Sequence, residues 1–218
     1  IHLVAVTKYA SVDDVRQLVD LGHVDFAESR LQHFTQIAAQ IDEYIGRRKE
    51  LGEPNIASPI RWHFIGHLQR NKCRRVIPLS RMIHSVDSLR LAEEIQEIAC
   101  KKDFVVEVLL QANISRERQK SGIAPAAVGY LLEQLETMSN VKARGMMCMA
   151  PPSENPEESR SVFQRCSELF TEMQSHPNCG ESFNVLSMGM SSDFEVAIEC
   201  GANIVRVGSA LFGVPATT

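Results

Sequence analysis

The sequence alternates short apolar runs with longer amphipathic stretches about eight times, and this alternation restricts the fold more than any other feature. Runs rich in β-branched residues predict buried strands, and stretches with apolar residues three or four positions apart predict helices. The predicted strands cover residues 3–6, 24–28, 61–65, 82–86, 104–112, 141–147, 183–186 and 204–207. The predicted helices cover residues 11–21, 31–45, 68–79, 88–99, 125–135, 157–174 and 191–200.

Such alternation favours parallel strands joined by crossover helices. About eight units in 218 residues predict an α/β fold of the (β/α)8 TIM-barrel type, with an open doubly wound sheet as the alternative. No GxGxxG motif follows the first strand and no Walker lysine motif occurs, which argues against an open nucleotide-binding sheet. No linker rich in Gly, Pro or Ser divides the chain, although Gly52, Pro54 and Pro59 predict an exposed loop. We therefore expect one barrel domain over residues 1–218.

Composition excludes several classes of protein. Hydrophobic residues at 44% and charged residues at 23% are ordinary for a globular chain. The formal net charge of −4, without a basic tail, gives no case for nucleic acid. No apolar run has the length of a membrane span, and no signal peptide is visible. The six cysteines form no CxxC pair, so we expect a reduced, cytoplasmic protein.

Lys8 directly follows the first predicted strand, and a helix capped by Ser11 begins soon after it. In a barrel, the carboxyl ends of the strands form the face where ligands bind. Lys8 is therefore either a solvated lysine at a strand end or an amine held for a carbonyl ligand.

The loops after the seventh and eighth strands, at 187–193 and 208–213, are rich in Gly and Ser. Loops in these positions often bind phosphate in barrels. The hydroxyl groups of Ser191 and Ser209, with backbone N–H groups around Met190 and Gly208, could hold a phosphate without a lysine. The alternative is simple helix capping by Ser191 and a tight turn at Gly208.

Arg206 lies within the eighth predicted strand, where a charge needs a partner. That partner is either a carboxylate in the core or an atom of a ligand. The first and eighth strands are neighbours in a closed barrel, so Lys8, Arg206 and the phosphate loops converge on one mouth.

An amine, a phosphate site and a cationic donor together describe a pocket for pyridoxal 5'-phosphate (PLP). The sequence resembles the YggS/PROSC family of PLP-binding proteins, also called PLP homeostasis proteins, over essentially its whole length. The motifs that carry the resemblance are Val-Thr-Lys at 6–8, Trp-His-Phe-Ile-Gly-His-Leu-Gln-Arg-Asn-Lys at 62–72, Lys-Ser-Gly at 120–122, Arg-Gly-Met-Met at 144–147, Leu-Ser-Met-Gly-Met-Ser at 186–191 and Arg-Val-Gly-Ser-Ala-Leu-Phe-Gly at 206–213.

This resemblance implies the fold-type III barrel of alanine racemase-like PLP proteins. It implies that Lys8 holds PLP as a Schiff base and that Arg206 faces the pyridine nitrogen. It places Ser191, Gly208 and Ser209 at the phosphate, with the backbone of Met190 nearby. It also implies a role in intracellular PLP homeostasis, with apo-PLP enzymes as candidate partners, and we expect a monomer that binds neither nucleic acid nor membranes.

Two alternatives to a PLP carrier are a PLP-dependent amino-acid racemase of the alanine racemase type and a phosphosugar-type barrel enzyme in which Lys8 binds phosphate. Fold-type III racemases, as a class, carry a second β domain that supplies a catalytic tyrosine, whereas this chain ends at Thr218 directly after the barrel. An arginine at the pyridine nitrogen also makes the ring a weaker electron sink. We therefore expect a binding protein rather than an enzyme.

Three features need separate interpretation. The family usually has Gly-Glu-Asn after its second strand, whereas this chain has Ala-Glu-Ser at 27–29, so Ser29 lacks the amide of that asparagine. His63 and His67 have a spacing that could bind zinc on a helix, but Gly66 lies between them and no HExxH accompanies them, so we expect no metal. The basic residues at 70, 72, 74 and 75 are expected on the solvated face of a helix rather than in a binding patch.

Overall fold

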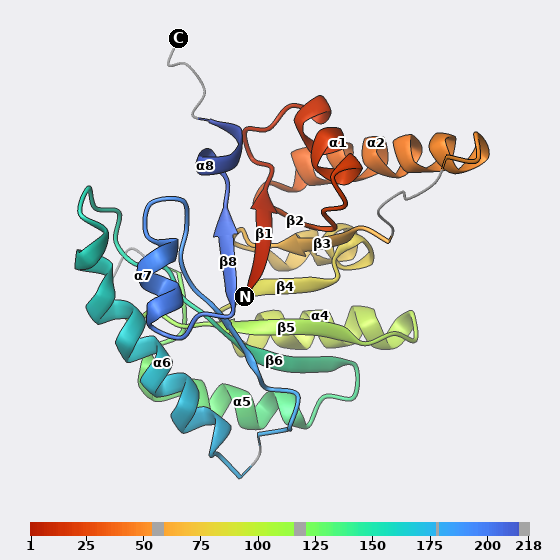
Figure 1. The fold of residues 1–218 in the computed structure, drawn as a ribbon. Coiled ribbons are helices and arrows are strands. Elements are labelled where there is room, and N and C mark those ends of the chain that lie inside the picture. Colours follow the sequence, from red (N-terminus) through yellow and green to blue (C-terminus); the bar gives the residue numbers. More distant parts are fainter. Residues whose placement is uncertain (54–58, 116–120, 178, 214–218) are drawn as a thin grey trace.

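The computed structural model describes residues 1–53, 59–115, 121–177 and 179–213, so the predicted loop at Pro54 and the Lys120 position of the Lys-Ser-Gly motif lie outside the described residues. Eight parallel strands pair in sequence order and close into a barrel (Figure 1). The strands are β1 (His2–Val6), β2 (Asp25–Glu28), β3 (Arg61–Phe64), β4 (Met82–Val86), β5 (Val106–Gln111), β6 (Val141–Met147), β7 (Val185–Ser187) and β8 (Ile204–Val207). The predicted barrel is confirmed, and the open-sheet alternative is wrong.

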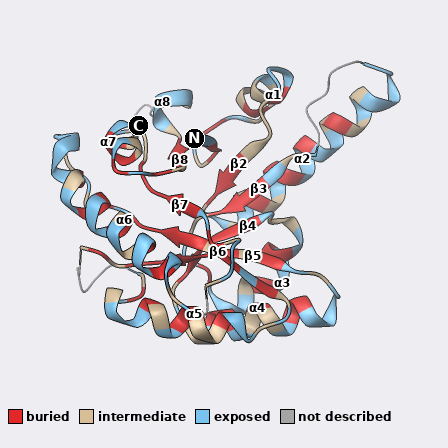
Figure 2. Ribbon diagram, turned by 60° about the horizontal axis from the view of Figure 1, so that its bottom comes forward, coloured by how far each residue is buried: buried red, intermediate tan, exposed pale blue. Residues whose placement is uncertain are grey.

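Helices surround the barrel and expose their outer sides, while the strands are buried (Figure 2). The α-helices are α1 (Val12–Asp20), α2 (Leu31–Glu50), α3 (Cys73–Val76), α4 (Leu89–Lys101), α5 (Val128–Glu136), α6 (Arg160–Gln174), α7 (Phe194–Glu199) and α8 (Ser209–Phe212). The short 3-10 helices are η1 (Arg70–Lys72), η2 (Ile77–Leu79), η3 (Pro125–Ala127) and η4 (Pro156–Ser159).

The first helix shows how the local sequence fixes an element. The Ser11 hydroxyl accepts from the Asp14 backbone N–H, and the Asp14 carboxylate accepts from the Ser11 backbone N–H, so the two residues form a capping box. Val15 and Val19, four residues apart, are fully buried against the barrel. The predicted N-cap at Ser11 is confirmed.

Three segments differ from the sequence-based expectation. The helix expected at 68–79 is divided into η1, α3 and η2, and α3 ends at Val76 because Pro78 has no N–H group to continue an α-helical pattern. A one-turn helix, α8, follows β8 where only a tight turn at Gly208 was expected. The helix expected from residue 191 begins at Phe194, with Asp193 at its N-cap position.

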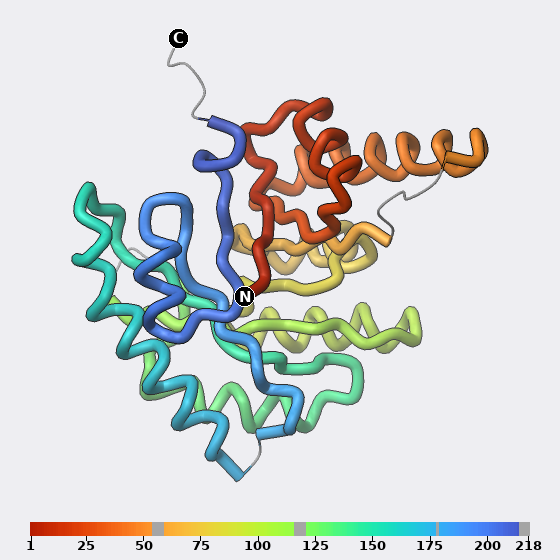
Figure 3. Tube along the Cα trace, in the orientation of Figure 1, coloured from red at the N-terminus to blue at the C-terminus, as the bar shows by residue number. Residues whose placement is uncertain are grey.

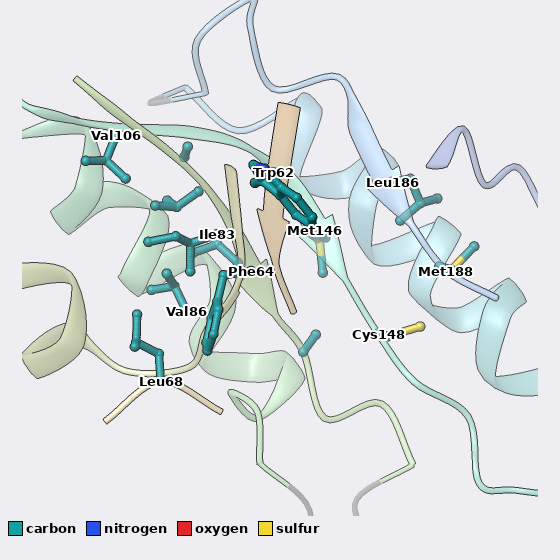
Figure 4. Close-up of a cluster of buried hydrophobic side chains, with 14 of the residues drawn as sticks. Trp62, Phe64, Leu68, Ile83, Val86, Val106, Met146, Cys148, Leu186 and Met188 are labelled. Atoms are coloured by element: carbon teal, nitrogen blue, oxygen red, sulfur yellow. The ribbon is translucent and has the colours of Figure 1, made fainter. Parts of the chain in front are cut away.

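The side chains of each strand alternate between two environments. Trp62 and Phe64 point outward into the layer between barrel and helices, where they pack with residues such as Ile83 and Val86 (Figure 4). A smaller apolar cluster fills part of the barrel interior and contains Val4, Ala27, Met82, Leu109, Met147, Val185 and Ile204. Fully burying such a side chain contributes about 1.5–3 kcal/mol, so both layers stabilise the closed barrel.

The first and last strands lie side by side, as the red and blue ends of the tube show in Figure 3. Val4 pairs with Arg206 and Ala5 pairs with Val207 in parallel register. Their carboxyl ends therefore lie at the same mouth of the barrel, next to α8.

A bulge in β6 depends on Gly145. Val108 pairs with Ala143 and Leu109 pairs with Gly145, so the register of β5 and β6 shifts by one residue between them. Gly145 has a φ of +149°, and a Cβ atom there would lie 1.8 Å from the carbonyl oxygen of Val185 on β7. Only glycine allows the two strands to approach this closely.

We predict that Gly145→Ala lowers the free energy of unfolding by about 2–3 kcal/mol, because the added methyl group must push β6 away from β7. Gly46→Ala is the matched control, since Gly46 lies inside α2 and a Cβ atom there would have no neighbour within 4 Å. The control should stabilise the protein by about 0.4–1 kcal/mol. Denaturant unfolding measures both changes, and equal stability of Gly145→Ala and the parent protein would contradict the prediction.

Candidate ligand-binding site

A cavity of about 400 Å³ opens at the carboxyl ends of β1 and β8. All the residues predicted to bind a cofactor line this cavity: Lys8, Met190, Ser191, Arg206, Gly208 and Ser209. The structure thus brings the predicted site residues together, and their binding roles stay predictions.

Lys8 lies two residues beyond the end of β1, on the rim of the cavity. Its Nζ atom is 4.6 Å from the centre of the Tyr9 ring, and the guanidinium carbon of Arg30 is 5.9 Å from the same ring. A hydrogen bond and the charge from Lys8, with a smaller contribution from Arg30, lower the pKa of Tyr9. Lys8 forms no salt bridge with any residue that the structure describes, so its amine is available to a ligand.

Arg206 is 3% exposed and also lines the cavity. Its guanidinium donates to the Ser187 hydroxyl oxygen at 2.6 Å and to the Cys148 carbonyl oxygen at 3.0 Å. Burial lowers the pKa of Arg206. Among the described residues, no carboxylate forms a salt bridge with Arg206, so the core carboxylate considered as its partner is not found. The guanidinium can therefore still donate to a ligand in the cavity.

One hydroxyl group ties the two predicted phosphate loops together. Ser191 Oγ accepts from the backbone N–H of Gly208 at 3.0 Å and from that of Ala210 at 3.2 Å. Ser191 therefore joins the loop after β7 to the start of α8, and the alternative in which it caps the following helix is wrong. Asp193 takes the N-cap position of α7, and its carboxylate accepts from the Met190 N–H at 2.7 Å.

Some backbone N–H groups of these loops are engaged within the protein, and others are free for an anion. The N–H groups of Met190 and Gly208 are engaged within the protein, as just described. In contrast, the N–H groups of Ser191, Ser192 and Ser209 have no hydrogen-bond acceptor among the described residues, and all three residues line the cavity. A cluster of unpaired N–H groups beside hydroxyl groups is suited to a phosphate.

The cavity also has two walls that the sequence-based reasoning did not identify. Ile65 follows β3 directly, and Met149 follows β6 by two residues. Tyr9, next to Lys8, and Phe212, in α8, also line the cavity. The signal that could have found Ile65 and Met149 is their position, since each lies just past the carboxyl end of a strand. Ser29 lines the cavity after β2 in the same way.

The two histidines considered as a zinc pair have different surroundings and different partners. His63 is in β3, 5% exposed, and its Nδ1 atom is 2.9 Å from His84 Nε2. His67 lies in the loop after β3, with its side chain 58% exposed and Nδ1 3.3 Å from an Asp87 oxygen. The described part of the chain contains no group of three side chains arranged to hold a metal ion.

Among the described helices, none combines the length and apolar character that a membrane crossing requires.

Comparisons with known proteins identify relatives along nearly the whole chain. Residues 4–216 match the family model for the alanine racemase N-terminal domain. The chain is 37% identical over 211 residues to the pyridoxal phosphate homeostasis protein of Aquifex aeolicus (strain VF5), and the match covers 97% of this chain and 86% of that protein. A second pyridoxal phosphate homeostasis protein, from Pseudomonas aeruginosa PAO1, is 36% identical over 98% of this chain and 84% of its own length.

Solved structures show the same relation. PipY of Synechococcus elongatus PCC7942, in its structure with PLP bound, matches with a TM-score of 0.82 at 32% identity, covering 98% of this chain and 92% of that chain. Alanine racemase of Clostridium difficile 630 matches with a TM-score of 0.72 at 16% identity, covering all of this chain and 53% of that chain. The racemase likeness shows a shared barrel fold and nothing more specific.

The contact between Lys8 and Tyr9 gives a prediction about the ligand-free protein. Lys8→Met removes the main cause of the lowered Tyr9 pKa, so this pKa should rise toward the ordinary tyrosine value of about 10. Titration of phenolate absorbance measures the change, and Lys142→Met, on the exposed side of β6, is the control. Tyr44, whose pKa is raised by burial and by Asp20, should titrate unchanged in both variants. An unchanged Tyr9 titration in Lys8→Met would contradict the geometry at the rim.

Proposed function

This chain belongs to the alanine racemase N-terminal domain family and, within it, to the pyridoxal phosphate homeostasis proteins, and from that membership we propose that it binds PLP in the cavity at Lys8 and Arg206 and acts in intracellular PLP homeostasis. The observation that carries the proposal is the convergence on one cavity of an amine, a buried guanidinium and unpaired backbone N–H groups. PLP carries an aldehyde, a ring nitrogen and a phosphate, and each has a chemically matched group here.

The residues present fit the cofactor on evidence within this chain. The cavity of about 400 Å³ lies in the size range of sites for small ligands. The unpaired N–H groups of Ser191, Ser192 and Ser209 need an acceptor, and a phosphate supplies several. Arg206 presents a cation without a carboxylate, next to the same cavity.

Each residue has a proposed role. Lys8 holds the cofactor through a Schiff base, which needs an amine that no carboxylate neutralises. Arg206 faces the ring nitrogen and donates to it. The Ser191 and Ser209 positions bind the phosphate, while Met190 and Gly208 shape the two loops because their own N–H groups are engaged. Ser29 lines the cavity at the position of the family's usual asparagine, with a shorter side chain that lacks the amide.

Binding and release fit these side chains better than catalysis. Bound PLP supplies an electron-withdrawing ring, but a racemase also needs an acid and a base on opposite faces of its substrate. Among the described residues that line the cavity, the titratable groups besides Arg206 are Lys8 and Tyr9, which are adjacent in sequence at the end of one strand. We therefore propose a carrier that binds as a single barrel domain over residues 1–218, acts as a monomer in the cytoplasm and passes PLP to apo-PLP enzymes.

The proposal predicts where PLP attaches. Borohydride reduction of the PLP-loaded protein should fix a phosphopyridoxyl group on the peptide that contains Lys8, detected by mass spectrometry. Lys8→Ala should lose both the label and the visible absorbance, whereas Lys142→Ala, with its exposed side chain on β6, should keep both. Labelling of another lysine in the parent protein, with normal absorbance in Lys8→Ala, would overturn the assignment.

The same PLP-loaded protein distinguishes a carrier from a racemase. A chiral assay with alanine and serine should show little or no interconversion of enantiomers, while an added apo-PLP enzyme should gain activity from the loaded protein. Turnover near an ordinary enzymatic rate of about 10 per second, lost in Lys8→Ala, would make this chain a racemase.

The phosphate position gives a separate prediction. Ser209→Ala removes one hydrogen bond to a charged group and should weaken PLP binding by about 1.5–3 kcal/mol. Pyridoxal has no phosphate, so its binding should hardly change. Equilibrium titration of both ligands measures the difference, and an equal loss for the two would place the phosphate elsewhere.

A further inference from the structure

A continuous chain of hydrogen-bonded polar side chains crosses the barrel interior beneath the cavity. Its members come from five strands and share the inward-facing side of the barrel. We call this set the buried polar chain; it consists of Arg206, Ser187, His84, His63 and Asp25. Ser187 and His84 have no exposed surface, and Arg206 and His63 are 3% and 5% exposed. Polar groups buried this deeply are held by their mutual hydrogen bonds.

The distances along the chain leave no break. Ser187 Oγ lies 2.6 Å from Arg206 Nη1 and 3.1 Å from His84 Nδ1. His84 Nε2 lies 2.9 Å from His63 Nδ1, and His63 Nε2 lies 3.3 Å from Asp25 Oδ1. Arg206 lines the cavity at the carboxyl ends of the strands, whereas Asp25 is the first residue of β2, at the opposite mouth. The chain therefore connects the two mouths of the barrel.

The two charged ends determine the proton positions between them. Arg206 can only donate, so the Ser187 oxygen accepts from it and the Ser187 hydroxyl donates to His84. His84 then donates from Nε2 to His63, and His63 donates from its own Nε2 to the carboxylate of Asp25. Burial, with the nearby His63 and Arg206, lowers the pKa of His84 well below its ordinary value, so this ring stays neutral. Every donor along the chain points toward Asp25.

Asp25 lies at a smaller cavity, of about 180 Å³, at the amino ends of the strands. Arg61 donates to its carboxylate from Nε at 2.7 Å and from Nη2 at 2.5 Å. Burial alone would raise the pKa of Asp25, but hydrogen bonds from His63 and Arg61 outweigh it and lower this pKa to about 2. The carboxylate is therefore charged at neutral pH. The other charged or titratable groups that line this cavity are His2, Arg81, Glu107 and Arg144.

We propose that the buried polar chain fixes the orientation of Arg206 toward the ring nitrogen of bound PLP, so that the charge of Asp25 at one mouth acts on the cofactor at the other. This inference rests on the proposed function, since it assigns a role at the same cavity. Hydrogen bonds aligned between an anion and a cation strengthen one another. Without the charge of Asp25, His84 is free to carry its proton on Nδ1, and the Ser187 oxygen must then accept from two donors at once. His63, His84 and Ser187 are thus positioning residues, since only Arg206 meets the ligand.

The first test needs no cofactor. In the ligand-free parent protein, side-chain nitrogen NMR should show the ring proton of both His63 and His84 on Nε2. Asp25→Asn keeps the shape of the side chain but removes its charge, so both rings should move toward a mixture of tautomers. Ser85→Ala is the matched control, because Ser85 is 1% exposed, neighbours His84 in β4, and has a hydroxyl without a partner in the described structure.

The second test uses the PLP-loaded protein. Asp25→Asn and Ser187→Ala should each shift the midpoint of the pH titration of visible absorbance by about half a pH unit or more. They should also weaken PLP binding by about threefold to tenfold, with Ser85→Ala unchanged in both measurements. Ser187→Ala leaves the pair of Asp25 and Arg61 intact. It therefore tests the positioning of Arg206 even if Asp25→Asn does not fold.

The outcomes separate this inference from the proposed function. A parent protein that binds no PLP would overturn the proposed function, and with it the role of Arg206 at the ring nitrogen. The histidine signals would still show whether the buried polar chain is ordered. PLP binding with an absorbance titration unchanged in both Asp25→Asn and Ser187→Ala would overturn the positioning role and leave the proposed function standing. Histidine rings already mixed in tautomer in the parent protein would also overturn it.

Discussion

The pairing of β1 with β8 is the constraint on which the rest of this structure depends. Until these strands meet, Lys8 and Arg206 belong to opposite ends of a long chain. Parallel register then sets Val4 beside Arg206 and Ala5 beside Val207, so the residues that follow both strands reach the same rim. The cavity is therefore a product of closure, and its chemistry exists only in the folded barrel.

The barrel interior divides its space between packing and polarity. Apolar side chains such as Leu109 and Met147 fill part of it, and a line of polar groups fills another part. A buried polar group without a partner costs more than a hydrogen bond gains, so each member of the line needs both of its neighbours. Replacing one of them by an apolar residue of similar size would leave its neighbours without a partner. This mutual dependence favours a single arrangement of the interior over a loosely packed one.

The sequence predicted the strands well because their signal is local. Apolar runs bounded by turn residues identified all eight, and a lysine, an arginine and two Gly/Ser loops after neighbouring strands identified the cavity. Features that depend on distant partners were harder. His63 suggested only a spacing with His67, whereas its actual neighbour is His84, which the register of β3 and β4 decides. The end of α3 just before Pro78 could in principle be predicted from the sequence, but α8 could not, since its four residues carry no periodicity.

The Ser191 hydroxyl has a thermodynamic consequence beyond the bonds it makes. By accepting from the N–H groups of both Gly208 and Ala210, it makes the loop after β7 and the start of α8 into one body. Two separate flexible loops would each lose conformational entropy on closing around an anion. Here that ordering is completed during folding, so the donors of these loops are held in place before any ligand arrives. The entropic cost then opposes folding of the barrel rather than association with a ligand.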